Sequence, residues 1–394
     1  MSYIIATFFI TLIGIIVSLF FVQARVTSPL SLHSISWFLV SLCGLIVYDD
    51  FIALTYNTFY NFILWYVPMY LILLYSEILY SINGGVTSKY DKKYYCSNYW
   101  LFIFIALIVT IHEIYTVGTA GDNGFFLNLR EASTIKDYDG VTPVFMNIFY
   151  PFVICMFAIS FISERTNKKN KTIASLWMIA FAIGTMGKFA IITPIIVYLV
   201  IRDHKKKINK GRLLFAIPPI ATLLLLLHFG RSADNDTETI STMIGTYIYS
   251  PLIAMSKLSV SSAGDGMEYT MRFAYAIMNK IGLSSTLPVE TILPYSDVPV
   301  PTNVYTVMQP FYQDLGSIGV LIGSLIYGIF FSILYGSARR GNAFSVLTYA
   351  LLSISLLTSF FAETLITNIS GNIKLIICLY LIWRFTVRKY YKLR

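Results

Sequence analysis

The segment PTNVYTVMQPFYQDLGSIGVLIGSLIYGIFFSILY, residues 301–335, carries the strongest structural signal in this chain. A polar stretch runs directly into an apolar run that is long enough to cross a bilayer as a helix. Asp314 stands where the apolar run begins, and Gly316, Gly319 and Gly323 follow along one side. Because small residues let helices approach closely, the segment predicts a packed membrane helix with a carboxylate at its mouth.

The rest of the chain has the same apolar character. Of its 394 residues 56% are hydrophobic and only 12% are charged, and the mean hydropathy is +0.68. The apolar runs are continuous rather than alternating, which favours helices over a closed barrel in the bilayer. We therefore predict an all-α, polytopic integral membrane protein.

Eleven apolar segments are expected to cross the membrane: 3–22, 32–48, 58–80, 98–117, 143–163, 173–187, 189–202, 213–229, 311–335, 343–362 and 373–386. The sixth and seventh are short. One long helix across both would place two basic loops on opposite sides, which the positive-inside rule opposes. We therefore expect a hairpin with its tip at 184–188, and short paired segments of this kind are typical of helices that line a cavity.

The orientation follows from the 29 basic residues. Most of them fall on one side when the N-terminus is placed outside and the C-terminus in the cytoplasm, as the positive-inside rule requires. No basic region precedes the first apolar run, so it is expected to be a span rather than a cleavable signal. The net charge of +9 therefore reflects topology and does not indicate nucleic-acid binding.

A long outside loop, residues 230–310, separates the eighth and ninth spans. Its segment 240–258 is apolar enough to lie on the membrane surface, and apolar residues recur at helical spacing over 266–281. Pro288, Pro294, Pro299 and Pro301 then predict an extended approach to the ninth span. Loops this long are usually functional, so we expect one transmembrane domain, 1–394, with a large loop that contains amphipathic helices.

Several classes of chemistry lack support in the sequence. There is no phosphate-cradling glycine loop, no metalloprotease motif and no Cys/His cluster with metal-ligand spacing. The four cysteines show no obvious disulfide partners, since three lie in apolar spans and Cys96 stands alone in a basic loop. We therefore predict neither a metal nor another cofactor.

Cations on the outer side are candidates for function because topology depletes them there. Arg231 directly follows the eighth span, where it could grip a diphosphate bidentately or simply snorkel to the interface. Lys188, at the hairpin tip, could bind the same group or anchor a helix end. Arg272 shares a helix face with Lys280, although an i,i+4 pair with Glu268 would also explain it.

Among possible acids and bases, Asp314 is the strongest candidate. It could be a general base or an orienting group facing an outside cavity, or a charge favoured by the helix dipole. His228 lies near the outer end of the eighth span and is a second candidate, although a lone His is more often satisfied locally. The pair His112–Glu113 and the loop residue Glu290 are weaker candidates.

Three short stretches stand out together: Asn303-Val-Tyr305-Thr306 followed by Asp314-Leu-Gly316 and Gly319, the Arg after the eighth span, and Gly187-Lys188 at the hairpin tip. Together they resemble the Wzy-type polymerases of oligosaccharide repeat units, which build O-antigens and capsules. The family usually has Gly-Arg at the last position. A Lys there still supplies charge, but it lacks the planar fork that binds phosphate bidentately.

The resemblance implies a glycosyltransferase whose substrates are undecaprenyl-diphosphate-linked oligosaccharides on the periplasmic side of the inner membrane. It implies catalytic roles for Asp314, Arg231 and His228, and substrate-binding roles for Lys188, Arg272, Lys280, Asn303 and Tyr305. A chain-length regulator and a flippase of the same pathway would be its partners. Two alternatives stay open, a polysaccharide flippase or other secondary transporter and an O-antigen ligase. The chain shows neither the repeated halves nor the mid-membrane charges of typical transporters.

Overall fold

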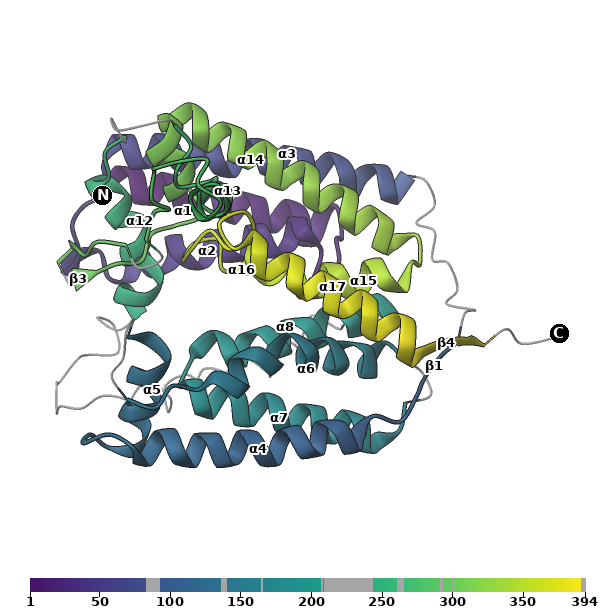
Figure 1. Ribbon diagram of the computed structural model, residues 1–394. Coiled ribbons are helices and arrows are strands. Elements are labelled where there is room, and N and C mark those ends of the chain that lie inside the picture. Colours follow the sequence, from purple (N-terminus) through teal and green to yellow (C-terminus); the bar gives the residue numbers. More distant parts are fainter. Residues whose placement is uncertain are drawn as a thin grey trace. The chain divides into compact units, whose positions relative to one another are not determined.

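The computed structural model describes residues 1–82, 93–135, 140–163, 166–206, 208, 244–260, 266–290, 293–299 and 301–390 (Figure 1). The chain divides into two compact units. The first comprises Met1–Val86, Glu238–Arg340 and Leu352–Ile373, and the second comprises Thr87–Thr237, Gly341–Leu351 and Lys374–Arg394.

The first unit is built on long apolar helices: α1 (Ser2–Ile16, extended by a π-helical turn, Val17–Phe21), α2 (Pro29–Ile46), α3 (Tyr56–Ile82) and α14 (Gln309–Arg339). Helices α3 and α14 lie side by side (Figure 1), and the Trp65 ring of α3 contacts Phe311 and Tyr327, with centroids 5.9 and 5.1 Å away. Helix α1 packs on α2, where the Thr11 and Ser41 hydroxyls form a buried hydrogen bond of 2.8 Å.

Helix α14 contains a sharp turn at Gly316, whose backbone has φ 61° and ψ −147°. Only glycine adopts such a conformation without strain. The turn brings Phe311 against the glycine side of the longer part of α14, since a Cβ at Gly319 would clash with the Phe311 carbonyl and one at Gly323 would lie 2.8 Å from its ring. The glycines therefore accommodate α14's own first turns.

Shorter elements complete the first unit. Turns at Gly245–Tyr249 and Met255–Lys257 flank α12 (Ser250–Ala254), and α13 (Arg272–Lys280) follows. The two-residue strands β2 (Ser296–Asp297) and β3 (Pro301–Thr302) pair antiparallel, with Ser296 opposite Thr302. Helix α16 (Ile354–Leu357) packs on α2, where the Ser36 hydroxyl donates to the Leu357 carbonyl at 2.9 Å.

The second unit contains α4 (Trp100–Thr119), α5 (Phe125–Thr134), α6 (Val144–Ile162), α7 (Lys168–Thr185), α8 (Lys188–Lys205), α15 (Ala343–Leu352) and most of α17 (Ile369–Thr386). Helix α7 packs against α4, α6 and α8. Strand β1 (Lys93–Cys96) pairs antiparallel with β4 (Val387–Tyr390). Asn170 fixes the start of α4, because its side chain donates to the Ser97 carbonyl and accepts from the Tyr99 N–H.

The predicted hairpin at 184–188 is found in the structure. Helix α7 ends where Met186 adopts a left-handed conformation, with φ 47°, and α8 begins at Lys188. Each of the two helices has 18 residues and they pack against each other. A continuous helix across 173–202 is thereby excluded.

Seven helices in the described part of the chain are long and apolar enough to cross a membrane: Ser2–Phe21, Pro29–Ile46, Tyr56–Ile82, Trp100–Thr119, Val144–Ile162, Gln309–Arg339 and Ile369–Thr386. They match seven of the expected spans and confirm an all-α polytopic membrane protein. Helix α14 also exposes an apolar stripe suited to lipid, including Ile318, Ile322, Ile329 and Ile333. The eighth expected span, 213–229, lies outside the described residues, and the total of eleven stays a prediction.

The region of the tenth expected span differs from the expectation of one helix over 343–362. Helix α15 ends at Leu352, and α16 stops at Leu357. The chain then turns, because the Glu363 carboxylate accepts backbone N–H groups from Leu365 and Ile366, which favours a compact loop before α17. Apolar composition alone does not reveal this interruption.

Candidate active site

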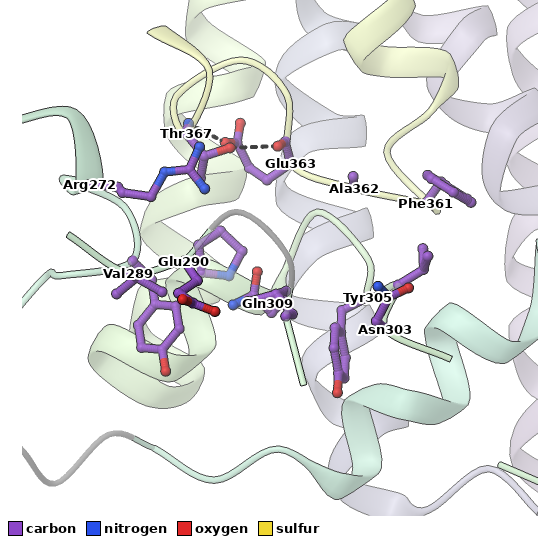
Figure 2. A pocket seen from close by; sticks show the side chains of 14 residues that line it. Arg272, Val289, Glu290, Asn303, Tyr305, Gln309, Phe361, Ala362, Glu363 and Thr367 are labelled. Carbon is purple, nitrogen blue, oxygen red and sulfur yellow. Dashed lines mark hydrogen bonds between the residues drawn. The ribbon is translucent and has the colours of Figure 1, made fainter. Parts of the chain in front are cut away.

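A cavity of about 260 Å³ lies in the first unit, beside the start of α14 (Figure 2). Four stretches of chain line it: Tyr269 and Arg272; Val289, Glu290 and Leu293; Asn303, Val304, Tyr305, Gln309 and Pro310; and Phe361, Ala362, Glu363 and Thr367. Arg272, Asn303 and Tyr305 were predicted from sequence to bind substrate. The fold brings all three to one cavity, although they come from two separate segments.

Arg272 is the cation of this cavity. Its side chain points toward Glu363 and Thr367 (Figure 2). Among the residues that the structure describes, its guanidinium makes no hydrogen bond or ion pair. The suggested i,i+4 pair with Glu268 is not formed, since α13 begins only at Arg272 and Glu268 precedes the helix. The guanidinium is therefore available to a ligand.

Asn303 and Tyr305 contribute differently. The Tyr305 hydroxyl donates to the Pro294 carbonyl at 2.9 Å and lies 2.8 Å from the Ser296 hydroxyl. These contacts hold the segment that contains Pro294 and Ser296 next to Tyr305 in the cavity wall. The Asn303 amide makes no hydrogen bond within the described part of the chain. An amide both donates and accepts, which suits recognition of a sugar hydroxyl.

Asp314 lies next to the cavity wall rather than in it. Its carboxylate accepts the backbone N–H of Tyr269 at 3.0 Å, the N–H of Thr270 at 2.8 Å and the Thr270 hydroxyl at 2.6 Å. Three hydrogen bonds from one dipeptide make Asp314 a cap, supplied by another segment, for the turn that leads into α13. The helix expected over 266–281 is confined to Arg272–Lys280.

Tyr269 connects Asp314 to the cavity. Burial, and then the carboxylates of Asp314 and Glu268, raise the pKa of Tyr269 above its usual range. The phenol therefore stays protonated over the working pH range. It lines the cavity as a neutral ring with a hydroxyl that can donate or accept.

Glu363 lines the cavity and was not singled out by sequence reasoning. It is 8% exposed and accepts the N–H groups of Leu365 at 2.9 Å, Ile366 at 2.8 Å and Thr367 at 2.5 Å, together with the Tyr327 hydroxyl. A carboxylate held by three N–H groups is fixed in place. The only sequence signal for Glu363 was an acidic residue that directly follows an apolar run. An acidic residue at the membrane interface gives the same signal, so the sequence does not identify a carboxylate that backbone N–H groups hold.

Other predicted residues lie elsewhere. Lys280 is exposed at the end of α13 and does not line the cavity. Lys188 starts α8 in the second unit, does not line the cavity and has an interaction partner of its own. Arg231 and His228 lie outside the described residues, so their roles remain predictions.

Within the His112–Glu113 pair, Glu113 has a structural role. The Glu113 carboxylate accepts the N–H groups of Phe145 at 2.7 Å and Met146 at 2.8 Å, which caps the start of α6. In the described part of the chain no group of three or more His, Cys, Asp or Glu side chains could hold a metal ion.

Comparison with known proteins adds one relationship. No family model matches the chain, and no solved structure matches it. The chain is 26% identical over 270 residues to a protein of Shigella dysenteriae named O-antigen polymerase, and the alignment covers 65% of this chain and 67% of that protein. This similarity supports the resemblance to the repeat-unit polymerases that the sequence motifs indicate, and with it a role in O-antigen polymerisation.

Proposed function

We propose that this chain joins oligosaccharide repeat units into an O-antigen or related surface polysaccharide by glycosyl transfer. The observation that carries the proposal is the similarity to an O-antigen polymerase over 65% of the chain. The donor is an oligosaccharide linked to undecaprenyl diphosphate, and the acceptor is the non-reducing-end sugar of a second lipid-linked unit. The convergence of Arg272, Asn303 and Tyr305 on one cavity supports the place assigned to the sugars.

The residues divide between two tasks. The leaving diphosphate develops negative charge in the transition state, which fixed cations stabilise. Arg231 is the first candidate for this role and Lys188 is the second. Arg231 is favoured because its planar guanidinium can bind phosphate bidentately. The cavity around Arg272 holds a sugar, Lys280 adds positive charge near the membrane surface, and Asp314 and His228 are the remaining predicted participants in proton transfer or positioning.

The membrane setting follows the same proposal. The enzyme is a multi-pass protein of the bacterial inner membrane, with its N-terminus in the periplasm and its C-terminus in the cytoplasm. It forms one transmembrane domain over 1–394, and the periplasmic loop 230–310 supplies three of the four stretches that line the cavity. A chain-length regulator and a flippase of the same pathway are its expected partners, and the reaction needs no cofactor.

A gene deletion tests the function against both alternatives. A strain that lacks a polymerase still flips and ligates repeat units, so its lipopolysaccharide should carry a single unit instead of a ladder. Plasmid-borne expression of the chain should restore the ladder. A core without any repeat unit would indicate a flippase or a ligase, and an unchanged ladder would refute a role in this pathway.

A further inference from the structure

We propose that the apolar groove between α6, α7 and α8 binds one acyl chain of an anionic phospholipid, whose phosphate lies among Lys171, Arg202 and Lys205. All the residues that line this groove belong to the second unit, and none of them lines the cavity beside α14. Binding of this lipid does not depend on the proposed glycosyl transfer.

The groove has a volume of about 500 Å³ and is lined by residues of α6, α7 and α8, which lie side by side (Figure 1). Apart from Ser175 and Tyr198, its lining residues are apolar. Ile179 and Ile183 in its wall are 57% and 40% exposed, so the groove opens onto an apolar surface of the unit. In a membrane protein such a surface faces the hydrocarbon chains of the bilayer.

Two aromatic residues form the wall of the groove where α6 ends. They are Phe161 of α6 and Tyr198 of α8, whose ring centroids are 5.0 Å apart. The Lys171 Nζ atom lies 5.7 Å from the centroid of the Phe161 ring, and the Lys205 ammonium donates to the Phe161 carbonyl at 2.7 Å. The Arg202 guanidinium donates to the Tyr198 hydroxyl at 2.5 Å. Three cations from α7 and α8 therefore meet at one wall of the groove.

The positive charge at this wall suits an anionic headgroup. Within the part of the chain that the structure describes, neither Lys171 nor Arg202 pairs with a carboxylate. Asp203 is the nearest described acid in the sequence of α8, but it is buried, accepts the Ile208 N–H at 2.9 Å and does not line the groove. A phosphate beside the aromatic wall would therefore meet cations without a competing carboxylate from the lining residues.

The headgroup, rather than the chain, gives the preference for one class of lipid. Lipid chains are as apolar as the side chains that they touch, so the groove alone hardly distinguishes among them. Basic pockets between membrane helices bind anionic headgroups, and each Lys or Arg near the surface contributes about fivefold in affinity. An anionic phospholipid satisfies both parts of the site, whereas a zwitterionic one satisfies only the apolar part.

The length and the position of the groove favour a phospholipid over the lipid-linked substrate. Its lining on α8 runs from Ala190 to Tyr198, about 12 Å along the helix. This is close to the roughly 15 Å that one leaflet contributes to the hydrocarbon core, and an undecaprenyl chain is much longer. Lys205 also lies about 26 Å along α8 from Lys188, the candidate for the diphosphate. The positive-inside rule places the Lys205 end in the cytoplasm, so the phospholipid belongs to the cytoplasmic leaflet.

The first test measures lipid binding to the purified, delipidated full-length chain by native mass spectrometry. Phosphatidylglycerol should bind roughly tenfold or more tightly than phosphatidylcholine with the same acyl chains. Lys171→Gln and Arg202→Gln should each weaken phosphatidylglycerol binding about fivefold. Lys168→Gln is the matched control, because Lys168 is exposed at the start of α7 and contacts no lining residue, and it should leave the affinity nearly unchanged. Equal binding of the two phospholipids, or an equal loss in Lys168→Gln, would overturn the proposal.

The second test fills the groove without changing a charge. Ile183→Trp places a large ring in the exposed part of the groove wall and should weaken phosphatidylglycerol binding by roughly tenfold or more, because the ring occupies the space of the chain. Leu176→Trp is the control, since Leu176 is exposed on the same helix and does not line the groove. Thermal unfolding of both variants without added lipid should match the wild type, which separates lost binding from lost folding. Wild-type affinity in Ile183→Trp, or tighter binding of undecaprenyl phosphate than of phosphatidylglycerol, would overturn the proposal.

Discussion

The Asp314 carboxylate holds Thr270 by two hydrogen bonds, from its backbone N–H at 2.8 Å and from its hydroxyl at 2.6 Å. Asp314 stands two residues before the turn of α14 at Gly316, and Thr270 stands two residues before Arg272. The contact therefore ties the position of Arg272 in the cavity to the rigid pair of helices α3 and α14. The sequence suggested Asp314 as a base, whereas the structure places it to position Arg272 through its hydrogen bonds to Thr270.

Asp314→Asn tests this positioning role. The substitution puts an amide N–H₂ opposite one of the donors, and a hydrogen bond to a charged group is worth about 1.5–3 kcal/mol. Polymerisation should fall roughly 10- to 150-fold, at tenfold per 1.4 kcal/mol. Thr270→Val should lower it in the wild-type background but add little to Asp314→Asn, because both changes break the same contact.

A catalytic Asp314 predicts a different pattern in the same experiment. Asp314→Asn alone would then remove the ladder completely, and Thr270→Val would leave it nearly normal. Ladder length and protein abundance, measured for the two single variants and the double variant, separate the two roles.

Arg231→Ala should abolish polymerisation while the protein still accumulates in the membrane. Loss of a charged hydrogen bond to a buried phosphate costs on the order of 2–5 kcal/mol, which is roughly 30- to several-thousand-fold. Arg231→Lys should restore activity only in part, because Lys lacks the planar fork. A ladder of normal length in Arg231→Ala would reject the role in diphosphate binding.

Reporter fusions test the predicted sides of the membrane. A phosphatase that is active only in the periplasm should be active when fused at Asn235 and inactive when fused at Arg340, which follows α14 directly. The positive-inside rule is the reason for this expectation. Activity at Arg340, or none at Asn235, would refute the orientation with the N-terminus outside.

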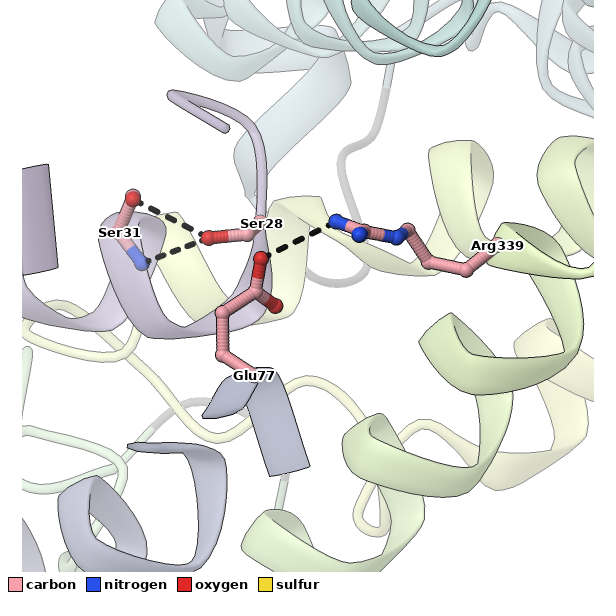
Figure 3. A network of polar contacts seen from close by, with 4 residues as sticks. All are labelled: Ser28, Ser31, Glu77 and Arg339. Atoms are coloured by element: carbon pink, nitrogen blue, oxygen red, sulfur yellow. Dashed lines mark hydrogen bonds and ion pairs between the residues drawn. The ribbon is translucent and has the colours of Figure 1, made fainter. Parts of the chain in front are cut away.

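The ion pair between Glu77 of α3 and Arg339 of α14, at 3.2 Å, should be structural (Figure 3). The side chains are only 6% and 20% exposed, and removal of one partner of a buried pair typically costs about 3–5 kcal/mol. Arg339→Met should therefore lower thermal stability in detergent, and adding Glu77→Leu should recover much of the loss. Equal stability of Arg339→Met and the wild type would show that solvent already screens the pair.

Much of the membrane architecture could be predicted from sequence because it depends on local composition. Continuous apolar runs predicted the long helices, and the charge rule together with Gly187 predicted the break between α7 and α8. The interruption after Leu357 could not be predicted, because residues 343–362 contain no charged residue, no glycine and no proline. It depends on hydrogen bonds from the Glu363 carboxylate, which only the folded chain reveals.

Only part of the candidate site could be predicted, because some of its contacts join segments that lie far apart in the sequence. Scarcity of outside cations pointed to Arg272, and the motif resemblance pointed to Asn303 and Tyr305. The partners of Asp314 lie more than forty positions earlier in the chain, and no periodicity reports such a contact. Sequence reasoning consequently did not reveal that Asp314 is engaged by Tyr269 and Thr270.

Reconstitution measures the central claim most directly. The purified chain is placed in lipid vesicles with undecaprenyl-diphosphate-linked repeat units extracted from the deletion strain, without nucleotide or other proteins. The proposed reaction predicts a ladder of lipid-linked oligosaccharides and one undecaprenyl diphosphate released for each bond formed. Repeat units that remain single, with no undecaprenyl diphosphate released, would contradict the assignment of this chain as the polymerase.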